Sequence, residues 1–259
     1  MSLELASQAF GSSGDAVVVM HGLFGAARNW TSIAKRLAED HRVFALDLRN
    51  HGASPWSDDV SYAAMAEDVR SFIEAEGIEP AVLIGHSMGG KVAMRLALEY
   101  RDLVEKLIVA DIAPVAYQHS FDEYFDAMRG VDLKAARRRA DVEAALAPGI
   151  PDRGIRGFLL QSLTRDDDGF AWQLNLDALA MHMDDLTGWP DDLPGRQFDG
   201  PTLFVGGERS DYLQPAHREA VLALFPEARF TTLKGAGHWL HAEQPDAFLR
   251  TVRAFLDQT

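Results

Sequence analysis

Residues 81–100 read AVLIGHSMGGKVAMRLALEY, an apolar run that passes through Gly85-His86-Ser87-Met88-Gly89 into an amphipathic segment. The run has the composition of a buried strand, and residues 88–100 have the spacing of a helix. A serine at such a tight turn adopts strained backbone angles, and the glycines on either side give the turn room. The N–H groups and dipole of the following helix favour negative charge beside Ser87. The stretch therefore predicts Ser87 as a nucleophile rather than an idle serine in a glycine-rich turn.

Short apolar runs and amphipathic segments alternate on both sides of this stretch, which is typical of βα units on a mostly parallel sheet. The expected strands are Ala16–Met20, Val43–Leu46, Ala81–Ile84, Leu107–Ala110, Pro201–Val205 and Arg229–Leu233. The expected helices are Asn29–Glu39, Tyr62–Glu76, Met88–Tyr100, Pro215–Leu224 and Pro245–Leu256. We therefore predict an α/β fold with helices flanking the sheet.

The alternation stops between the fourth and fifth expected strands, where residues 115–195 are rich in charge and in helix formers. Ala135–Ala147 and Trp172–Met183 are the clearest predicted helices in this stretch. It holds fifteen Asp and Glu residues against eight Lys and Arg residues. We expect a helical insertion that lies over the sheet as a cap, and a core made of residues 1–114 and 196–259.

The composition limits the partners and the location of the chain. Its 259 residues carry 39 acidic against 25 basic side chains, a formal charge of −14, which disfavours nucleic acid and anionic membrane surfaces. There is no cysteine, and so no disulfide or thiol nucleophile. The first residues have neither the basic nor the apolar region of a secretory signal, and every apolar run is too short to span a bilayer. A soluble, cytoplasmic protein is expected.

A serine nucleophile needs a base, and His238 is the best placed of the nine histidines. It lies in Lys234-Gly-Ala-Gly-His238-Trp239, after the last expected strand and before the last helix, in a loop that Gly235 and Gly237 allow to bend. His241, three residues further on, is interpreted as a residue that orders this loop.

Acyl transfer also needs two N–H groups that stabilise an oxyanion. The amide of Met88 follows from the turn itself, and the loop Met20-His21-Gly22-Leu23-Phe24-Gly25 after the first expected strand offers the amide of Leu23. His21 is interpreted as a scaffold residue, because no cysteine pair or H-E-x-x-H pattern accompanies it. Neither a metal nor a cofactor is expected.

The acid that orients His238 has two candidates, each after an expected strand. Asp111 lies in Val109-Ala-Asp111-Ile-Ala-Pro114, and Asp211 lies in Gly206-Gly-Glu-Arg-Ser-Asp211. Asp15 and Asp47 are weaker candidates, because a pair between Asp47 and Arg49 is expected to brace its own loop. The residues alone leave Asp111 and Asp211 open.

Together these motifs resemble the α/β-hydrolase superfamily, and within it the small YbfF-type bacterial esterases and their mitochondrial relatives. The matching motifs are His21-Gly-Leu-Phe-Gly25, Asp47-Leu-Arg-Asn-His-Gly52, Gly85-His-Ser-Met-Gly-Gly90, Asp111-Ile-Ala-Pro114 and Gly237-His238-Trp239. The resemblance implies an eight-stranded, mostly parallel sheet with a helical cap, and activity on short-chain esters. It carries over Ser87 and His238 as catalytic residues and Leu23 and Met88 as oxyanion donors. The serine that the family has after the penultimate strand matches Ser210, which favours Asp111, although Asp211 stands beside Ser210.

The sequence thus predicts a serine carboxylesterase that cleaves short- to medium-chain uncharged esters of small molecules through an acyl-enzyme. Phe24 and Trp239 are expected to line the substrate pocket, with residues of the insertion such as Phe121, Tyr124, Phe125 and Trp172. A thioesterase, a C–C bond hydrolase or a cofactor-free perhydrolase would use the same groups. A protein that kept the fold for binding alone belongs to a different class, and it would have no need of nucleophile and base.

Overall fold

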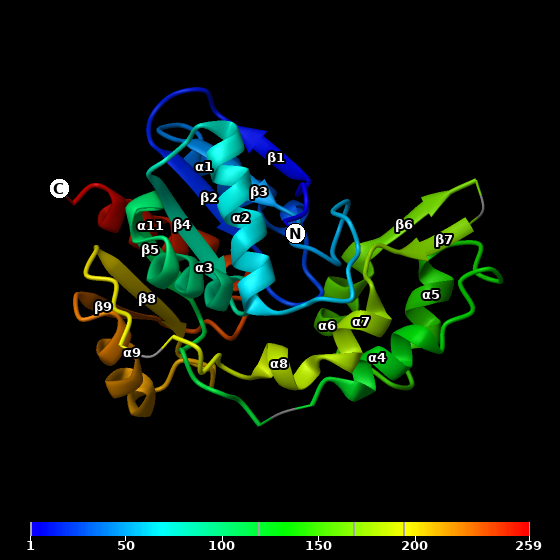
Figure 1. Cartoon of the computed structure of the whole chain (residues 1–259). Coiled ribbons are helices and arrows are strands. Elements are labelled where there is room, and N and C mark those ends of the chain that lie inside the picture. Colours follow the sequence, from blue (N-terminus) through cyan, green and yellow to red (C-terminus); the bar gives the residue numbers. More distant parts are fainter. Residues whose placement is uncertain (1, 119, 168, 194, 259) are drawn as a thin grey trace.

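The computed structural model describes residues 2–118, 120–167, 169–193 and 195–258. Its centre is a seven-stranded sheet in the order β1-β3-β2-β4-β5-β8-β9, in which β1 is antiparallel and the other strands are parallel (Figure 1). The strands are β1 (Ser7–Phe10), β2 (Ala16–Met20), β3 (Arg42–Leu46), β4 (Ala81–His86), β5 (Val104–Ala110), β8 (Thr202–Gly207) and β9 (Ala228–Leu233). The six expected strands are therefore present, with β1 in addition.

Helices cover both faces of the sheet, because its central strands are buried on both sides. Along β2, Val17 and Val19 pack into one core cluster, and Val18 and Met20 into the other. The first cluster includes α1 (Thr31–Leu37), α10 (Leu240–Glu243) and α11 (Pro245–Leu256), and the second includes α2 (Tyr62–Glu76), α3 (Met88–Glu99) and α9 (Arg218–Leu224). Short 3-10 helices are η1 (Ala27–Trp30), η2 (Arg101–Leu103) and η4 (Pro215–His217).

The expected count of eight strands is wrong for the described residues, which form seven strands in the central sheet. The segment before β1 bonds to other parts of the chain instead of forming a further strand. The amide of Leu3 donates to the Asp68 carboxylate in α2, at 2.6 Å, and the amide of Ala6 donates to Ser54 Oγ, at 2.8 Å.

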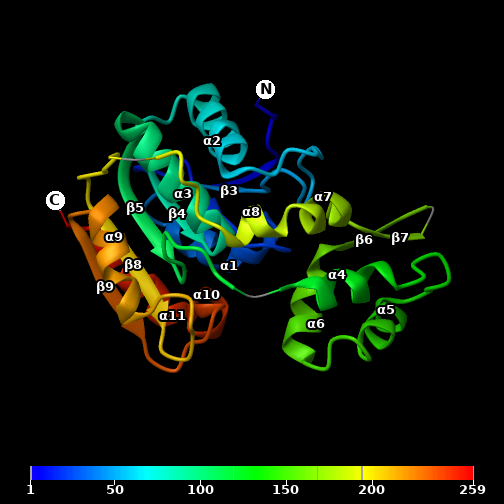
Figure 2. The same ribbon diagram turned by 60° about the horizontal axis from the view of Figure 1, so that its bottom comes forward.

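Between β5 and β8 the chain forms a second group of elements, which we call the β5–β8 segment (residues 115–195). Figures 1 and 2 show most of this group together to one side of the sheet, connected to it through α8. Its elements are α4 (Asp122–Arg129), α5 (Arg139–Leu146), α6 (Arg153–Leu159), η3 (Leu160–Ser162), β6 (Leu163–Asp166), β7 (Gly169–Trp172), α7 (Leu176–Met181) and α8 (Met183–Thr187).

The two helices expected in this segment have different bounds in the structure. The helix expected over residues 135–147 begins only at Arg139, because Asp141 accepts hydrogen bonds from the amides of Arg137 and Arg138 and so caps the helix there. The helix expected over residues 172–183 was wrong at its start. Asn175 caps α7 by accepting from the amide of Ala178, and the residues before it pair as the β6–β7 hairpin. In the described part of the chain no helix is long and apolar enough to cross a bilayer.

Candidate active site

Ser87 lies at the turn between β4 and α3 in a backbone conformation that side chains rarely adopt, with φ 51° and ψ −120°. A methyl group on Gly85 would come within 2.2 Å of the carbonyl oxygen of Gly89, and one on Gly89 within 2.5 Å of that of His21. Both positions therefore require glycine. The turn places Ser87 at the N-terminus of α3, where the helix dipole favours negative charge.

His238 follows β9 and forms a hydrogen bond with the carboxylate of Asp111, which follows β5. The distance from His238 Nδ1 to Asp111 Oδ2 is 2.7 Å. Asp111 is fully buried, and it also accepts from the amide of Gly207 at 2.9 Å and from the hydroxyl of Ser210. A carboxylate with these donors stays an acceptor, so Nδ1 of His238 carries the proton and Nε2 is left to act as a base.

The second acid candidate does not share this position. Asp211 is exposed, and its carboxylate accepts from Gln214 Nε2 at 2.8 Å. The carboxylate that contacts His238 is therefore that of Asp111 and not that of Asp211.

Two side chains that the sequence did not single out hold His238 in place. The ring of Tyr212 stacks on the imidazole at 4.0 Å between ring centroids. His86 Nε2 donates to the carbonyl oxygen of His238 at 2.9 Å. Burial lowers the pKa of His86 well below its ordinary value, so this ring is neutral and has one N–H to donate. The position of His86 beside Ser87 could have identified it as a residue of the site. Nothing in the sequence identifies Tyr212 as the residue that stacks on His238.

The loop after β2 lies directly against Ser87. A methyl group on Gly22 would come within 2.9 Å of His86 Nδ1 and 3.1 Å of the Ser87 β-carbon. His21 braces this loop, because its Nδ1 donates to the carbonyl of Gly22 and its Nε2 accepts from the amide of Leu48. The described residues offer no acceptor to the amides of Leu23 and Met88. Both N–H groups are therefore available beside Ser87.

Two small cavities, of about 50 and about 30 Å³, meet at Ser87. The larger is mostly apolar, and Leu23, Phe24, His238 and Trp239 of the core line it together with Phe121, Tyr124, Ile155 and Phe158 of the β5–β8 segment. Two further aromatics expected there lie elsewhere. Phe125 packs beneath Phe24 at 5.0 Å between ring centroids, and Trp172 donates to the carbonyl of Met128.

Ser87 and His238 line the larger cavity together but are not hydrogen-bonded to each other in the described structure. Catalytic hydrogen bonds of this kind are often long without substrate and shorten in the complex. The arrangement therefore brings a serine, a histidine paired with a carboxylate and two N–H donors close together, as acyl transfer requires.

The loop after β3 differs from the expectation for Asp47 and Arg49. Asp47 does brace its surroundings, accepting from the amides of Ala27 at 2.6 Å and Ala53 at 2.9 Å. Arg49, however, pairs with Asp68 in α2 at 2.7 Å and not with Asp47. The Asp68 carboxylate accepts hydrogen bonds from two nitrogens of the planar Arg49 guanidinium. The Asp47 carboxylate does not offer this pairing, because both of its oxygens already accept from backbone amides.

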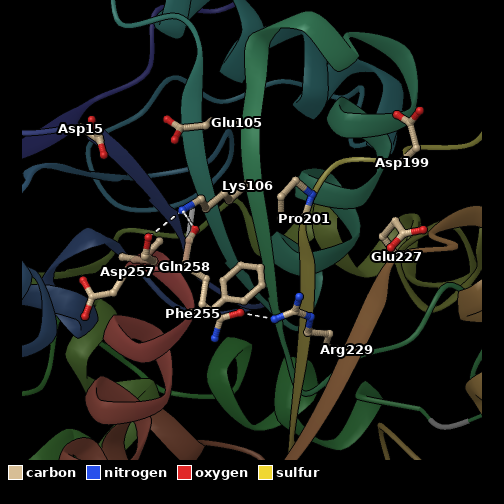
Figure 3. Close-up of a pocket in the computed structure, with 11 residues that line it drawn as sticks. Asp15, Glu105, Lys106, Asp199, Pro201, Glu227, Arg229, Phe255, Asp257 and Gln258 are labelled. Atoms are coloured by element: carbon tan, nitrogen blue, oxygen red, sulfur yellow. Dashed lines mark hydrogen bonds between the residues drawn. The ribbon is translucent and has the colours of Figure 1, made fainter.

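A larger cavity, of about 600 Å³, lies at the opposite edge of the sheet, where β2, β5, β8 and β9 begin (Figure 3). Acidic side chains predominate around it, and its two cations are already bonded. Lys106 donates to the carbonyls of Leu256 and Gln258, and Arg229 donates to the side chain of Gln258. None of the described residues that line it is a serine or a histidine, so it offers no pair of the kind found at Ser87 and His238. No cluster of three or more histidines and carboxylates suited to a metal occurs among the described residues.

Residues 15–245 match the model of a protein family described as having the alpha/beta hydrolase fold, and the chain belongs to this family. It is 41% identical over 251 residues to "sn-1-specific diacylglycerol lipase ABHD11" of Mus musculus, which covers 93% of this chain and 80% of the mouse protein. It is 39% identical over 242 residues to "Esterase YbfF" of Escherichia coli (strain K12), which covers 93% of this chain and 92% of the bacterial protein.

Among solved structures, "Marine microorganism esterase" is 38% identical, with a TM-score of 0.94 over 98% of this chain and 100% of that one. These relatives are esterases and lipases, and the protein is a hydrolase. The predicted superfamily, and the likeness to YbfF-type esterases, are confirmed.

Proposed function

We propose that the protein is a serine carboxylesterase, with Ser87 as nucleophile, His238 as base and Asp111 as the acid that orients the base. The observation that carries this proposal is the hydrogen bond between His238 Nδ1 and Asp111 Oδ2, beside a cavity that Ser87 and His238 line together. The identity to esterases and lipases over most of the chain supports the same reaction.

In this mechanism His238 Nε2 takes the proton of Ser87 as its hydroxyl attacks the ester carbonyl. The amides of Leu23 and Met88 stabilise the oxyanion, and loss of one such donor typically costs about 3 kcal/mol of barrier. His238 then protonates the leaving alcohol and activates the water that releases the acid. Asp111 stays ionised and stabilises the imidazolium.

We also propose that residues 115–195 act as a helical cap on a core of residues 1–114 and 196–259. Phe121, Tyr124, Ile155 and Phe158 of the β5–β8 segment line the same cavity as Ser87, which supports this division. The substrate is then a small ester held between cap and core, with Phe24 and Trp239 in contact with it.

Labelling with a fluorophosphonate probe tests the proposal, because such probes react with activated serines. Labelling and hydrolysis of p-nitrophenyl butyrate are expected in the parent protein and absent in Ser87→Ala and His238→Ala, with folding checked by circular dichroism. Ser7→Ala, an exposed serine in β1, is the matched control and keeps both. Labelling that survives in Ser87→Ala would show that the nucleophile is another residue.

A further inference from the structure

Lys91 is a buried lysine one helical turn after Ser87. Its amide donates to the carbonyl of Ser87 at 3.1 Å, so both residues lie on the same side of α3, and its side chain is 1% exposed. The ammonium donates to the carbonyl of Thr187 at 2.8 Å and to that of Gly188, at the end of α8. No carboxylate of the described residues forms an ion pair with it.

Two tyrosine rings complete the surroundings of Lys91. Its Nζ lies 5.7 Å from the ring centre of Tyr62 and 5.0 Å from that of Tyr117. Both tyrosine hydroxyls already donate to carbonyls, that of Tyr62 to Leu186 and that of Tyr117 to Tyr212. An ammonium has three N–H donors, and the carbonyls of Thr187 and Gly188 use two of them. One donor of Lys91 is therefore left for a ligand.

The smaller cavity at Ser87 connects this donor to the nucleophile, because Ser87, Met88 and Lys91 line it together. His238 lines only the larger cavity. Since His238 must reach the oxygen of the leaving alcohol to protonate it, the alcohol belongs in the larger cavity. An acyl group that extends from Ser87 on the other side would then enter the smaller cavity and point towards Lys91.

We propose that Lys91 selects esters whose short acyl group ends in a carboxylate, that is, half-esters of small dicarboxylic acids. This inference rests on the proposed esterase function and names its substrate class. A carboxylate at the end of the acyl group would accept the third N–H of Lys91 and supply the counter-charge that the buried ammonium lacks.

The acidic composition of the β5–β8 segment predicts the opposite preference, for uncharged acyl groups. Charges on the surface are screened beyond about 8 Å at physiological ionic strength, whereas a cation inside a cavity is screened much less. When Lys91 is charged, we therefore expect it to act on a ligand in the cavity more strongly than the surface charges do. Burial lowers the pKa of Lys91 to about 7, and a bound carboxylate would favour its charged form.

Hydrolysis of two esters of matched shape tests the proposal. Monoethyl succinate carries the carboxylate, and ethyl 4-methylpentanoate has an isopropyl group in its place; a pH-stat measures both. The parent protein is expected to have the higher kcat/KM for monoethyl succinate. In Lys91→Met the ratio of the two kcat/KM values should fall roughly 10- to 100-fold, the worth of a hydrogen bond to a charged group. The ratio is the readout because damage to α8 would lower both rates alike.

Equal losses for the two esters, or a parent protein that prefers the uncharged ester, would overturn the proposal. A second experiment measures the binding of both esters to Ser87→Ala by calorimetry. This variant does not hydrolyse the esters, and its Lys91 is unchanged. Tighter binding of monoethyl succinate is expected there, and equal or weaker binding overturns the role of Lys91 whether or not Lys91→Met folds. Failure of the esterase function is a different result, namely fluorophosphonate labelling that does not depend on Ser87.

Discussion

At the scale of single residues, the contact between Asp111 and His238 makes a sharp prediction about the two acid candidates. Asp111→Asn should lower kcat on the order of 10⁴-fold, the effect of amide replacement in such a triad, because the amide would no longer hold the proton of His238 on Nδ1. Asp211→Asn should retain most of the activity, since its carboxylate bonds only to Gln214 in the described structure. Steady-state hydrolysis of p-nitrophenyl butyrate measures both.

The double variant is the control for this pair. If either carboxylate can serve His238, each single change would have a modest effect and the double change a large one. A collapse in Asp211→Asn alone would assign the acid to Asp211. Folding must be verified for Asp111→Asn, since Asp111 also accepts the amide of Gly207.

The glycines around Ser87 give a second prediction at this scale. Gly89→Ala would place a methyl group 2.5 Å from the backbone oxygen of His21, which cannot move independently of the loop after β2. We expect a loss of about 1–3 kcal/mol in the free energy of unfolding, as overpacking typically costs, and a marked loss of turnover as the turn shifts. Urea unfolding and ester hydrolysis measure the two effects.

Gly157→Ala is the matched change, because nothing lies within 4 Å of the added methyl group. Gly157 is exposed in α6, so alanine there should stabilise the protein by about 0.5–1 kcal/mol. Equal stability of Gly89→Ala and the parent would show that the turn has more room than the structure indicates.

At the scale of elements, a buried ion pair joins the loop after β3 to helix α2. Arg49 and Asp68 have side chains only 2% and 0% exposed and meet at 2.7 Å. Asp68→Ala should destabilise the protein by about 3–5 kcal/mol, because it removes the buried carboxylate that pairs with the guanidinium and leaves only the exposed Asp59, at 3.8 Å. The midpoint of urea unfolding measures this change.

The exposed pair of Arg36 and Asp246 has the same 2.7 Å separation, with side chains 45% and 71% exposed. Asp246→Ala should therefore cost less than about 1 kcal/mol. Similar losses of stability in both variants would mean that burial does not determine how much these ion pairs contribute to the free energy of unfolding.

The elements that the sequence predicted well are those whose pattern is set by local burial. The central strands are mostly apolar. Helices α2 and α11 have the predicted bounds, because one face of each packs on the sheet. The β6–β7 hairpin was missed, since β7 is half-buried throughout and β6 runs from the buried Leu163 to the exposed Asp166, so neither strand shows alternation. The starts of α5 and α7 depend on single capping side chains, which the helical spacing does not reveal.

The candidate site divides in the same way. The turn at Ser87 and the loop of His238 have local sequence patterns, and these two residues do line one cavity. The acid was left open, because only the packing of β5 beside β8 decides which carboxylate meets the histidine. The sequence shows Lys91 as a lysine in an otherwise apolar helix. It does not show the surroundings of Lys91, because the neighbours come from α2, α8 and the loop after β5, which are far apart in the sequence.

At the scale of the whole molecule, four buried histidines, His21, His51, His86 and His241, lie at the carboxyl ends of the strands or in the segments that follow them. Burial lowers the pKa of His21 to about 4 and those of His51 and His241 to about 3, and it holds the pKa of His86 well below its ordinary value. In the described part of the chain His51 Nε2 and His241 Nδ1 have no hydrogen-bond partner. The folded protein therefore keeps these four rings neutral.

This predicts that the protein loses stability steeply as the pH falls below about 6.5. In the unfolded chain each histidine has a pKa near 6.5 and takes up a proton that the folded ring does not accept, so unfolding binds protons and stability rises with pH in this range. Each such proton changes the free energy of unfolding by about 1.4 kcal/mol per pH unit, and four together by roughly 5 kcal/mol per unit. Because a typical domain is stable by only about 5–15 kcal/mol, we expect cooperative unfolding between about pH 6 and pH 4.

Urea unfolding at pH 7.5, 6.5 and 5.5 measures how steeply the free energy of unfolding depends on pH. His241→Phe, which keeps the stacking on Trp30, should reduce the slope at low pH by about one proton. A free energy of unfolding that stays constant down to pH 5 would mean that the folded protein accommodates these histidines in their charged form.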